Sequence, residues 1–211
     1  ASAGRIRIAS TPAFGLEVLP RAIASFREKY PETVFDIETL HLDEMSDALR
    51  ETRIDMGLAF NPVESPGIDQ QQLASGRFVV LAPEAETFGG KTELTVEDLA
   101  GLPFISLNSR GPLGQALSEY IASHDVNLDV VAWSETYHVA AALVAKGSGV
   151  TIADDITARS SLTANLRRYR LRPALKFTVK ALHLDNAPLS VGAKRFTKHL
   201  STVLKDFLSD D

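Results

Sequence analysis

The sequence contains no cysteine among its 211 residues. This absence excludes disulfide bridges, iron–sulfur clusters, thiolate zinc sites and cysteine nucleophiles. The five histidines, at positions 41, 124, 138, 183 and 199, show none of the i, i+3 or i, i+4 spacings that build metal sites on helices. G-x-S-x-G, H-E-x-x-H and P-loop motifs are also missing. We therefore expect no metal ion, no cofactor and no catalytic constellation.

Long apolar runs and an excess of positive charge are missing as well. No run reaches the roughly 18 apolar residues that would suggest a bilayer span. The 22 Lys and Arg residues against 27 Asp and Glu give a net charge of −5. A free-standing nucleic-acid binder would carry a basic surface, so any DNA contact would need residues outside this chain. The 45% hydrophobic and 23% charged residues are typical of a soluble globular protein.

Strands and helices alternate in the first part of the chain. Leu19, Ile23, Phe26 and Tyr30 follow helical spacing, and we expect Asp43 or Asp47 to cap the next helix. This alternation is typical of a parallel sheet covered by helices. The predicted strands are 6–9, 34–40 and 54–60, and the predicted helices are 19–30 and 43–53.

A second alternating series follows a polar stretch. Gly147 is placed to end one of its helices. The predicted strands are 78–82, 104–107, 130–133, 150–153 and 177–184, the helices 117–122, 139–145 and 191–208, and the loops 83–94 and 108–114. Two series of similar size predict an α/β protein with two lobes, 1–76 with 182–211 and 77–181. We expect two crossover strands to join the lobes and a cleft to lie between them.

Polar residues follow several of the predicted strands. In open parallel sheets ligands bind beyond the carboxyl ends of the strands, so we expect the binding residues there. The hydroxyls of Ser10 and Thr11 can hold a carboxylate, or they can cap the helix that follows. The candidate ligand-binding residues are Ser10, Thr11, Pro12, Phe60, Asn61, Ser106, Asn108, Ser109, Thr136, His138 and Asp154.

Alternatives stay open for the candidates in the second lobe. Segment 106–111 has a composition that can cradle an anion, and it is equally typical of an ordinary capped loop. His138, in the helix start at 136–138, can donate to a carboxylate or simply be solvated. Asp154 and Asp155 can cap the helix they precede, or one carboxylate can bind an ammonium or guanidinium group. The basic run 167–172 favours a solvated strand edge over a phosphate-binding patch.

Three motifs resemble the effector-binding domain of LysR-type transcriptional regulators. They are RIRIASTPAFGLEVLP at 5–20, RIDMGL at 53–58 and VAKGSGVTI at 144–152, and their order and spacing match over about residues 4–208. The resemblance implies a two-lobed type 2 periplasmic-binding-protein-like fold made of two Rossmann-like subdomains. It also implies a homodimer, formed through helices near 16–29 and 114–123, and a tetramer of the full-length protein. DNA contact would come only from an N-terminal winged helix-turn-helix domain, which this chain lacks.

The segment IADDITA at 152–158 resembles a variant found in lysine-biosynthesis and opine-catabolism regulators, although Asp155 replaces the usual proline. Because these regulators belong to amino acid and opine metabolism, the resemblance slightly favours an amino-acid-like effector over a simple carboxylate. We predict a cytoplasmic, non-enzymatic sensor of a small anionic or zwitterionic metabolite, with no membrane partner. One alternative is a periplasmic solute-binding protein of a transporter for amino acids or small carboxylates. A second alternative is an enzyme on the same fold.

Overall fold

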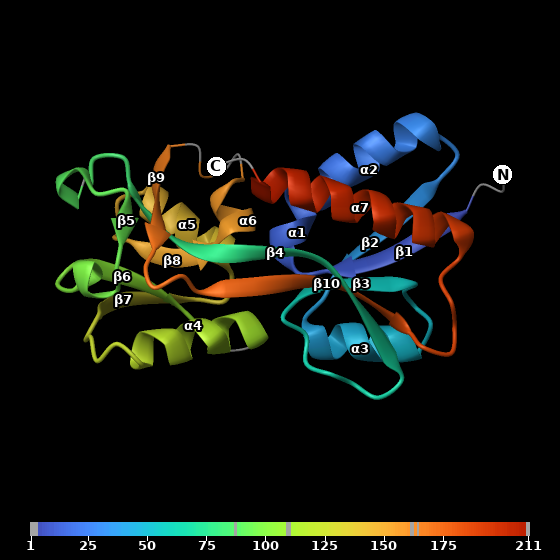
Figure 1. The fold of residues 1–211 in the computed structure, drawn as a ribbon, viewed down its shortest axis with the longest axis horizontal. Coiled ribbons are helices and arrows are strands. Elements are labelled where there is room, and N and C mark those ends of the chain that lie inside the picture. Colours follow the sequence, from blue (N-terminus) through green and yellow to red (C-terminus); the bar gives the residue numbers. More distant parts are fainter. Residues whose placement is uncertain (1–3, 87, 109–110, 161–162, 164, 210–211) are drawn as a thin grey trace. The chain divides into compact units, whose positions relative to one another are not determined.

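The computed structural model describes residues 4–86, 88–108, 111–160, 163 and 165–209. The chain divides into two compact units, Ala1–Ser75 with Thr178–Asp211 (unit 1) and Gly76–Phe177 (unit 2). Strands β4 (Ile68–Pro83) and β10 (Lys176–Leu184) each continue from one unit into the other (Figure 1). The lobe boundaries predicted from the sequence lie in the same two strands.

Unit 1 is built on a mostly parallel sheet with strand order β2-β1-β3-β10. Strand β1 pairs in parallel with β2 and β3, and β10 runs antiparallel to β3. The predicted strand and helix alternation is therefore confirmed for this unit. Its other elements are β1 (Arg5–Ser10), α1 (Pro12–Gly15), α2 (Val18–Lys29), β2 (Val34–Thr39), α3 (Leu42–Arg50), β3 (Met56–Phe60) and α7 (Val191–Ser209).

Aromatic rings join helices α2 and α7 in the core of unit 1. The ring of Phe26 on α2 lies edge-on to Phe196 on α7, with centroids 5.2 Å apart, and also contacts Phe35 on β2 at 6.0 Å. Phe26 and Phe196 are buried. The amphipathic patterns predicted for both helices thus face one another across the same core.

The start of α3 differs from the prediction. The helix begins at Leu42, and the residue before it is His41, whose backbone N–H donates to the Glu44 carboxylate at 2.9 Å. The expectation that Asp43 or Asp47 caps this helix is wrong because both lie inside it.

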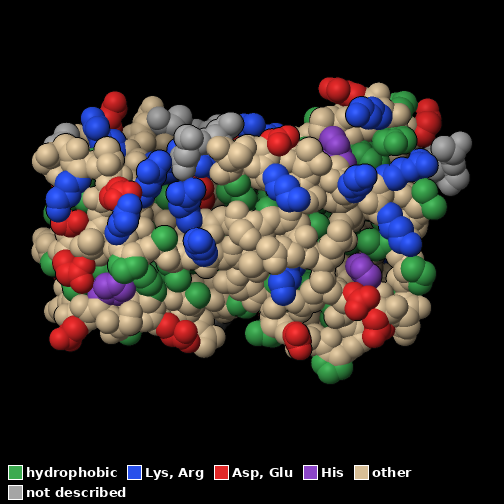
Figure 2. All heavy atoms as spheres, in the orientation of Figure 1, with side chains coloured by type: hydrophobic (Ala, Val, Ile, Leu, Met, Phe, Trp, Pro, Cys, Tyr) green, Lys and Arg blue, Asp and Glu red, His purple; other side chains and the backbone are tan. Residues whose placement is uncertain are grey.

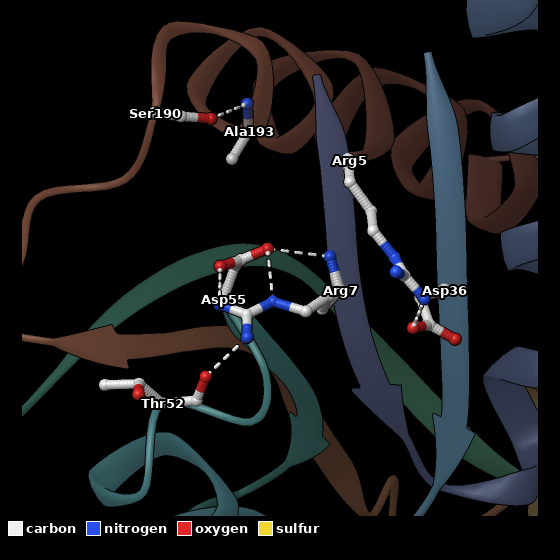
Figure 3. A network of polar contacts seen from close by, with 7 residues as sticks. All are labelled: Arg5, Arg7, Asp36, Thr52, Asp55, Ser190 and Ala193. Atoms are coloured by element: carbon white, nitrogen blue, oxygen red, sulfur yellow. Dashed lines mark hydrogen bonds and ion pairs between the residues drawn. The ribbon is translucent and has the colours of Figure 1, made fainter.

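The strands of unit 1 are also linked by side chains: Arg7 on β1 pairs with Asp55, which precedes β3 (Figure 3).

Unit 2 contains a mostly antiparallel sheet, in which β5 and β9 pair in parallel, and a separate parallel pair of strands. Strands β8 and β9 both pair antiparallel with β4, β5 pairs with β9, and β6 pairs in parallel with β7. A bridge between Phe104 and Val150 joins the two sheets. The elements are η1 (Phe88–Gly90), β5 (Glu93–Leu94), η2 (Glu97–Leu99), β6 (Pro103–Leu107), α4 (Pro112–Ala122), β7 (Asp129–Ser134), α5 (Tyr137–Ala145), β8 (Thr151–Asp154), α6 (Asp155–Ala158) and β9 (Leu166–Leu171).

Two sequence predictions for unit 2 need correction. Helix α4 begins at Pro112, five residues earlier than expected, because proline suits the first turn of a helix. The predicted loop 83–94 contains η1 and β5. In contrast, the predicted role of Gly147 is confirmed: it follows α5 with φ of 79°, a left-handed value that favours glycine.

Residues 167–171 of the basic run lie on β9, and Arg172 follows it; β9 pairs with β4 on one side and with β5 on the other. The expected strand edge is therefore wrong, because β5 covers part of it. The arginines still point to solvent, and Figure 2 shows Lys and Arg side chains gathered over this part of unit 2. Arg170 and Arg172 both form ion pairs with Glu93.

Across the described residues, no helix is long and apolar enough to span a bilayer.

Candidate functional site

The first predicted site residues, Ser10 and Thr11, lie where β1 ends and α1 begins. Both hydroxyl oxygens are buried, and neither has a hydrogen-bond partner among the described residues. Thr11 is the N-cap residue of α1, but its side chain makes no capping hydrogen bond; only its carbonyl accepts, from Phe14 N–H at 3.2 Å. The structure therefore contradicts the alternative that these hydroxyls cap the helix. Pro12 occupies the first turn of α1.

The next pair, Phe60 and Asn61, ends strand β3 in the same unit. The Phe60 ring stacks on Phe14 of α1, with centroids 4.3 Å apart, so the ends of β1 and β3 share one apolar contact. The Asn61 side chain points elsewhere. Its Oδ1 accepts hydrogen bonds from the backbone N–H of Thr178 at 2.7 Å and from the Thr178 hydroxyl at 3.2 Å. Asn61 therefore fixes β3 to β10 through its amide oxygen.

In unit 2 the ends of β6 and β7 come together. Asn108 N–H donates to the Ser134 carbonyl at 2.9 Å, and Ser106 is paired with Trp133. Thr136 caps α5, because its Oγ1 accepts from Val139 N–H at 3.3 Å. For Thr136 the structural role is thus observed. Ser109, also predicted to bind ligand, lies outside the described residues.

Asp154 ends β8, next to the strand that bears Ser106. Its side chain is completely buried, with 0% exposure. Oδ1 accepts from Thr157 N–H at 2.8 Å, which caps the short helix α6, while Oδ2 has no hydrogen-bond partner among the described residues. Burial raises the pKa of Asp154 to about 6, against the opposing effect of hydrogen bonds from Thr157. The capping alternative is therefore observed for Oδ1, and the ligand-binding alternative stays a prediction.

Two residues near Asp154 carry buried hydroxyls that sequence reasoning did not select. Tyr137 begins α5, and its hydroxyl has no partner among the residues described; burial and the nearby Asp154 charge raise the pKa of Tyr137 well above its ordinary value. The Thr157 Oγ1 is also buried; it has no partner of normal hydrogen-bond geometry within that part of the chain, but it lies close enough to the Asp154 carboxylate to help lower the pKa of Asp154. The available signal was Asp154 itself, since aspartate is a preferred N-cap residue that accepts from an N–H of the following turn.

His138 follows Tyr137 on α5 and is half-buried. Burial lowers the pKa of His138, so the ring is neutral at pH 7 and supplies no positive charge to a ligand carboxylate. Its Nε2 has no partner within the described ranges. In the same part of the chain, no group of three or more His, Asp or Glu side chains is placed to hold a metal ion.

The site residues thus form one set in each unit. Unit 1 brings Ser10 and Thr11 close to Phe60, through Phe14, and turns the Asn61 amide oxygen toward β10. Unit 2 places Asp154 beside Tyr137 and Thr157 at the end of β8. Both sets combine buried hydroxyl groups with apolar surroundings, an arrangement that suits recognition of a small polar molecule.

Comparisons with known proteins identify relatives of this chain. A family model described as the LysR substrate binding domain matches residues 1–205. The HTH-type transcriptional regulator DgcR of Pseudoalteromonas sp is 35% identical over 201 residues, which are 95% of this chain and 69% of that protein. The transcriptional activator protein LysR of Escherichia coli is 25% identical over 201 residues, 95% of this chain and 65% of that protein.

Solved structures of similar domains confirm the fold. The BenM effector binding domain with its effector benzoate gives a TM-score of 0.81 at 18% identity and covers 98% of this chain and 95% of that one. The regulatory domain of Synechocystis CcmR in complex with 2-PG gives 0.81 at 20% identity, over 96% and 98% of the two chains. The two-lobed periplasmic-binding-protein-like fold predicted from the sequence is therefore confirmed.

Proposed function

Because the chain belongs to the LysR substrate binding domain family, we propose that it senses a small metabolite for a bacterial transcriptional regulator. The observation that carries the proposal is the pair of buried hydroxyls, Ser10 Oγ and Thr11 Oγ1, which have no partner among the described residues. Burying a hydroxyl without a hydrogen bond costs about 1–3 kcal/mol. Such a cost is reasonable where a ligand oxygen supplies the missing partner.

The proposed effector is a small anionic or zwitterionic molecule. Ser10 and Thr11 donate to its carboxylate, and polar groups of unit 2 at Ser106, Asn108, Ser109 and Thr136 are the other candidate contacts. His138 is neutral and contributes a hydrogen bond rather than a charge. Phe60 supplies apolar surface, and Asn61 contributes through its amide nitrogen because its oxygen is bonded to Thr178.

The proposed chemistry is recognition without turnover. Effector binding favours one conformation of the domain and changes how subunits are arranged. Dimers form through the helical segments 16–29 and 114–123, and full-length chains form tetramers. DNA is contacted by a helix-turn-helix domain outside this chain, and the protein works in the cytoplasm without a membrane partner.

Calorimetric titration with small carboxylates and amino acids tests the proposal. We expect at least one of them to bind, and we expect Thr11→Val to weaken that binding about ten- to hundred-fold, since a lost hydrogen bond in a buried site costs about 1–3 kcal/mol. An unchanged affinity in Thr11→Val would remove the end of β1 from the site. The gene sequence upstream of Ala1 tests the alternatives: a signal peptide there would favour a periplasmic solute-binding protein.

A further inference from the structure

Asp154 is the most deeply buried acidic side chain of the candidate site, and half of its carboxylate is unused. Oδ1 caps α6 through Thr157 N–H, but Oδ2 has no hydrogen bond among the described residues. A buried carboxylate oxygen without a partner is costly, and proteins normally pair such groups. Capping α6 needs only one oxygen, and an asparagine would supply it. The second oxygen therefore requires another explanation.

The cations of this region are bound to a different carboxylate. Arg159 Nε lies 3.0 Å from Asp155 Oδ1, and Arg168 Nη1 lies 3.9 Å from the same atom. Within the described ranges, no Lys, Arg or His nitrogen lies within salt-bridge distance of Asp154. The charge of Asp155 next to it further disfavours ionisation. Asp154 therefore has no positively charged side chain as a salt-bridge partner among the described residues, although Arg159 and Arg168 both pair with the adjacent Asp155.

Two further oxygen atoms share this environment with Oδ2. The Tyr137 hydroxyl is buried close enough to feel the Asp154 charge, and the Thr157 hydroxyl lies on the residue that bonds to Oδ1. The ring of Tyr137 packs edge-on against Phe78, which is paired with Asp154 in the sheet. Asp154 and Tyr137 are therefore both neighbours of Phe78, and Thr157 is bonded to the same Asp154 carboxylate.

We propose that Asp154 Oδ2, together with the hydroxyls of Tyr137 and Thr157, binds an ammonium group of the effector. A primary ammonium carries three N–H donors and no acceptor, so it can donate to Asp154 Oδ2 and to the two hydroxyl oxygens, none of which has a partner of normal hydrogen-bond geometry among the described residues. The inference rests on the proposed sensing function and narrows it. The effector is then a zwitterion such as an amino acid, and a plain carboxylate lacks the group that Asp154 requires.

Matched pairs of probes test this inference on the purified domain. The panel contains the protein amino acids in L and D form, each with the 2-hydroxy acid of the same carbon skeleton, and affinity is measured by calorimetry. We expect one or more amino acids to bind at least tenfold more tightly than their hydroxy acids. Asp154→Asn keeps the side-chain shape and the cap of α6, and we expect it to abolish this preference.

A second variant and a control separate binding from folding. Thr157→Val leaves the backbone cap in place and removes one proposed ligand oxygen, so we expect the amino acid to bind three- to tenfold more weakly. Asp98→Asn is the control, because Asp98 also accepts a backbone hydrogen bond, from Thr95, but lies at η2. It should leave both affinities unchanged.

The pH dependence gives an independent readout. Tyr137, His138, Asp155, Arg159 and Arg168 are the other titratable or charged groups near Asp154; burial lowers the pKa of His138, and burial together with the Asp154 charge raises the pKa of Tyr137. Amino acid affinity should fall as pH decreases from 7 to 5, because the cation must compete with a proton on Asp154. The hydroxy acid should lack this trend.

Three results would overturn the inference: equal affinity for an amino acid and its hydroxy acid, an undiminished preference in Asp154→Asn, or no binding by any amino acid. Carboxylate binding that depends on Thr11 but not on Asp154 would leave the proposed sensing function intact and remove only the ammonium site. The two proposals are thus separable by the same titrations.

Discussion

Asp55 holds Arg7 with both carboxylate oxygens: Arg7 Nη2 donates to Oδ1 at 2.6 Å, and the Arg7 backbone N–H donates to Oδ2 at 2.8 Å (Figure 3). The Asp55 side chain is only 28% exposed. Because Arg7 lies on β1 and Asp55 immediately precedes β3, this pair fixes the relative position of the two strands whose ends carry Thr11 and Phe60.

We expect Asp55→Asn to lower the free energy of unfolding by about 1–2 kcal/mol at pH 7, since hydrogen bonds to charged groups are worth about 1.5–3 kcal/mol and partial exposure reduces that value. Asp36→Asn is the control: Asp36 pairs with Arg5 on the same strand, but both side chains are exposed, so the loss should be under about 1 kcal/mol. Urea unfolding measures both variants. Equal losses would contradict a special role for Asp55.

The same pair predicts acid sensitivity. Burial pushes the pKa of Asp55 upward, but the hydrogen bonds and charge of Arg7 outweigh it and hold the pKa below its ordinary value. An acid with a lowered pKa in the folded state stabilises the protein above its unfolded pKa of about 3.9, and this contribution is lost as pH falls through the folded pKa. The stability difference between wild type and Asp55→Asn should therefore shrink below about pH 4.

Thr11→Val should not destabilise the ligand-free domain. Its hydroxyl is buried with no partner among the described residues, so replacing it with a methyl group removes a desolvation cost. We expect the free energy of unfolding to stay the same or rise by about 1 kcal/mol. Thermal and urea unfolding without ligand provide the measurement. A loss of more than about 1 kcal/mol would show that the hydroxyl serves the fold.

Asp154→Asn should stabilise the ligand-free domain at neutral pH. The folded pKa of about 6, raised by burial, exceeds the unfolded value of about 3.9. Folding therefore favours the protonated form, and wild-type stability rises as pH falls from above 6 to about 4. Asparagine resembles the protonated acid, so the variant should be more stable by about 2–3 kcal/mol at pH 7.5, with the difference vanishing near pH 4. A difference independent of pH would contradict the raised pKa.

Trp133, the only tryptophan, reports on self-association. It lies on β7 of unit 2 with 65% exposure, beside the exposed Val131. We expect light scattering to show a dimer at tens of micromolar. The predicted contact uses the helical segments 16–29 and 114–123, so a shift of Trp133 emission to longer wavelength on dilution would show that β7 takes part as well. Trp133→Lys should then weaken association at least tenfold, since burying an aromatic side chain contributes more than about 1.4 kcal/mol. A monomer at every concentration would contradict the predicted homodimer.

The spacing of apolar residues predicted the strands and helices on which the candidate site residues lie, because that spacing depends only on residues close together in the sequence. The strand ends at Ser10 and Asp154 follow from the same patterns. The role of Asn61 was not accessible, since its partner Thr178 is 117 residues away and only the folded sheet brings them together. Likewise, the cap that Asp154 Oδ1 makes can be predicted from neighbouring residues. Whether Oδ2 has a hydrogen-bond partner depends on which distant residues pack over it. Buried polar atoms without partners are a property of packing and leave no mark in the sequence.

The passage of β4 and β10 between the units has a consequence for synthesis on the ribosome. Unit 2 is one uninterrupted segment, Gly76–Phe177, and it is complete before the last 34 residues of unit 1, Thr178–Asp211, are translated. Until α7 emerges, Phe26 and Phe35 lack the Phe196 ring that covers them. The nascent chain can therefore fold its second unit first, and premature termination within the last helix leaves the first unit with an uncovered aromatic core, a state that chaperones and proteases recognise.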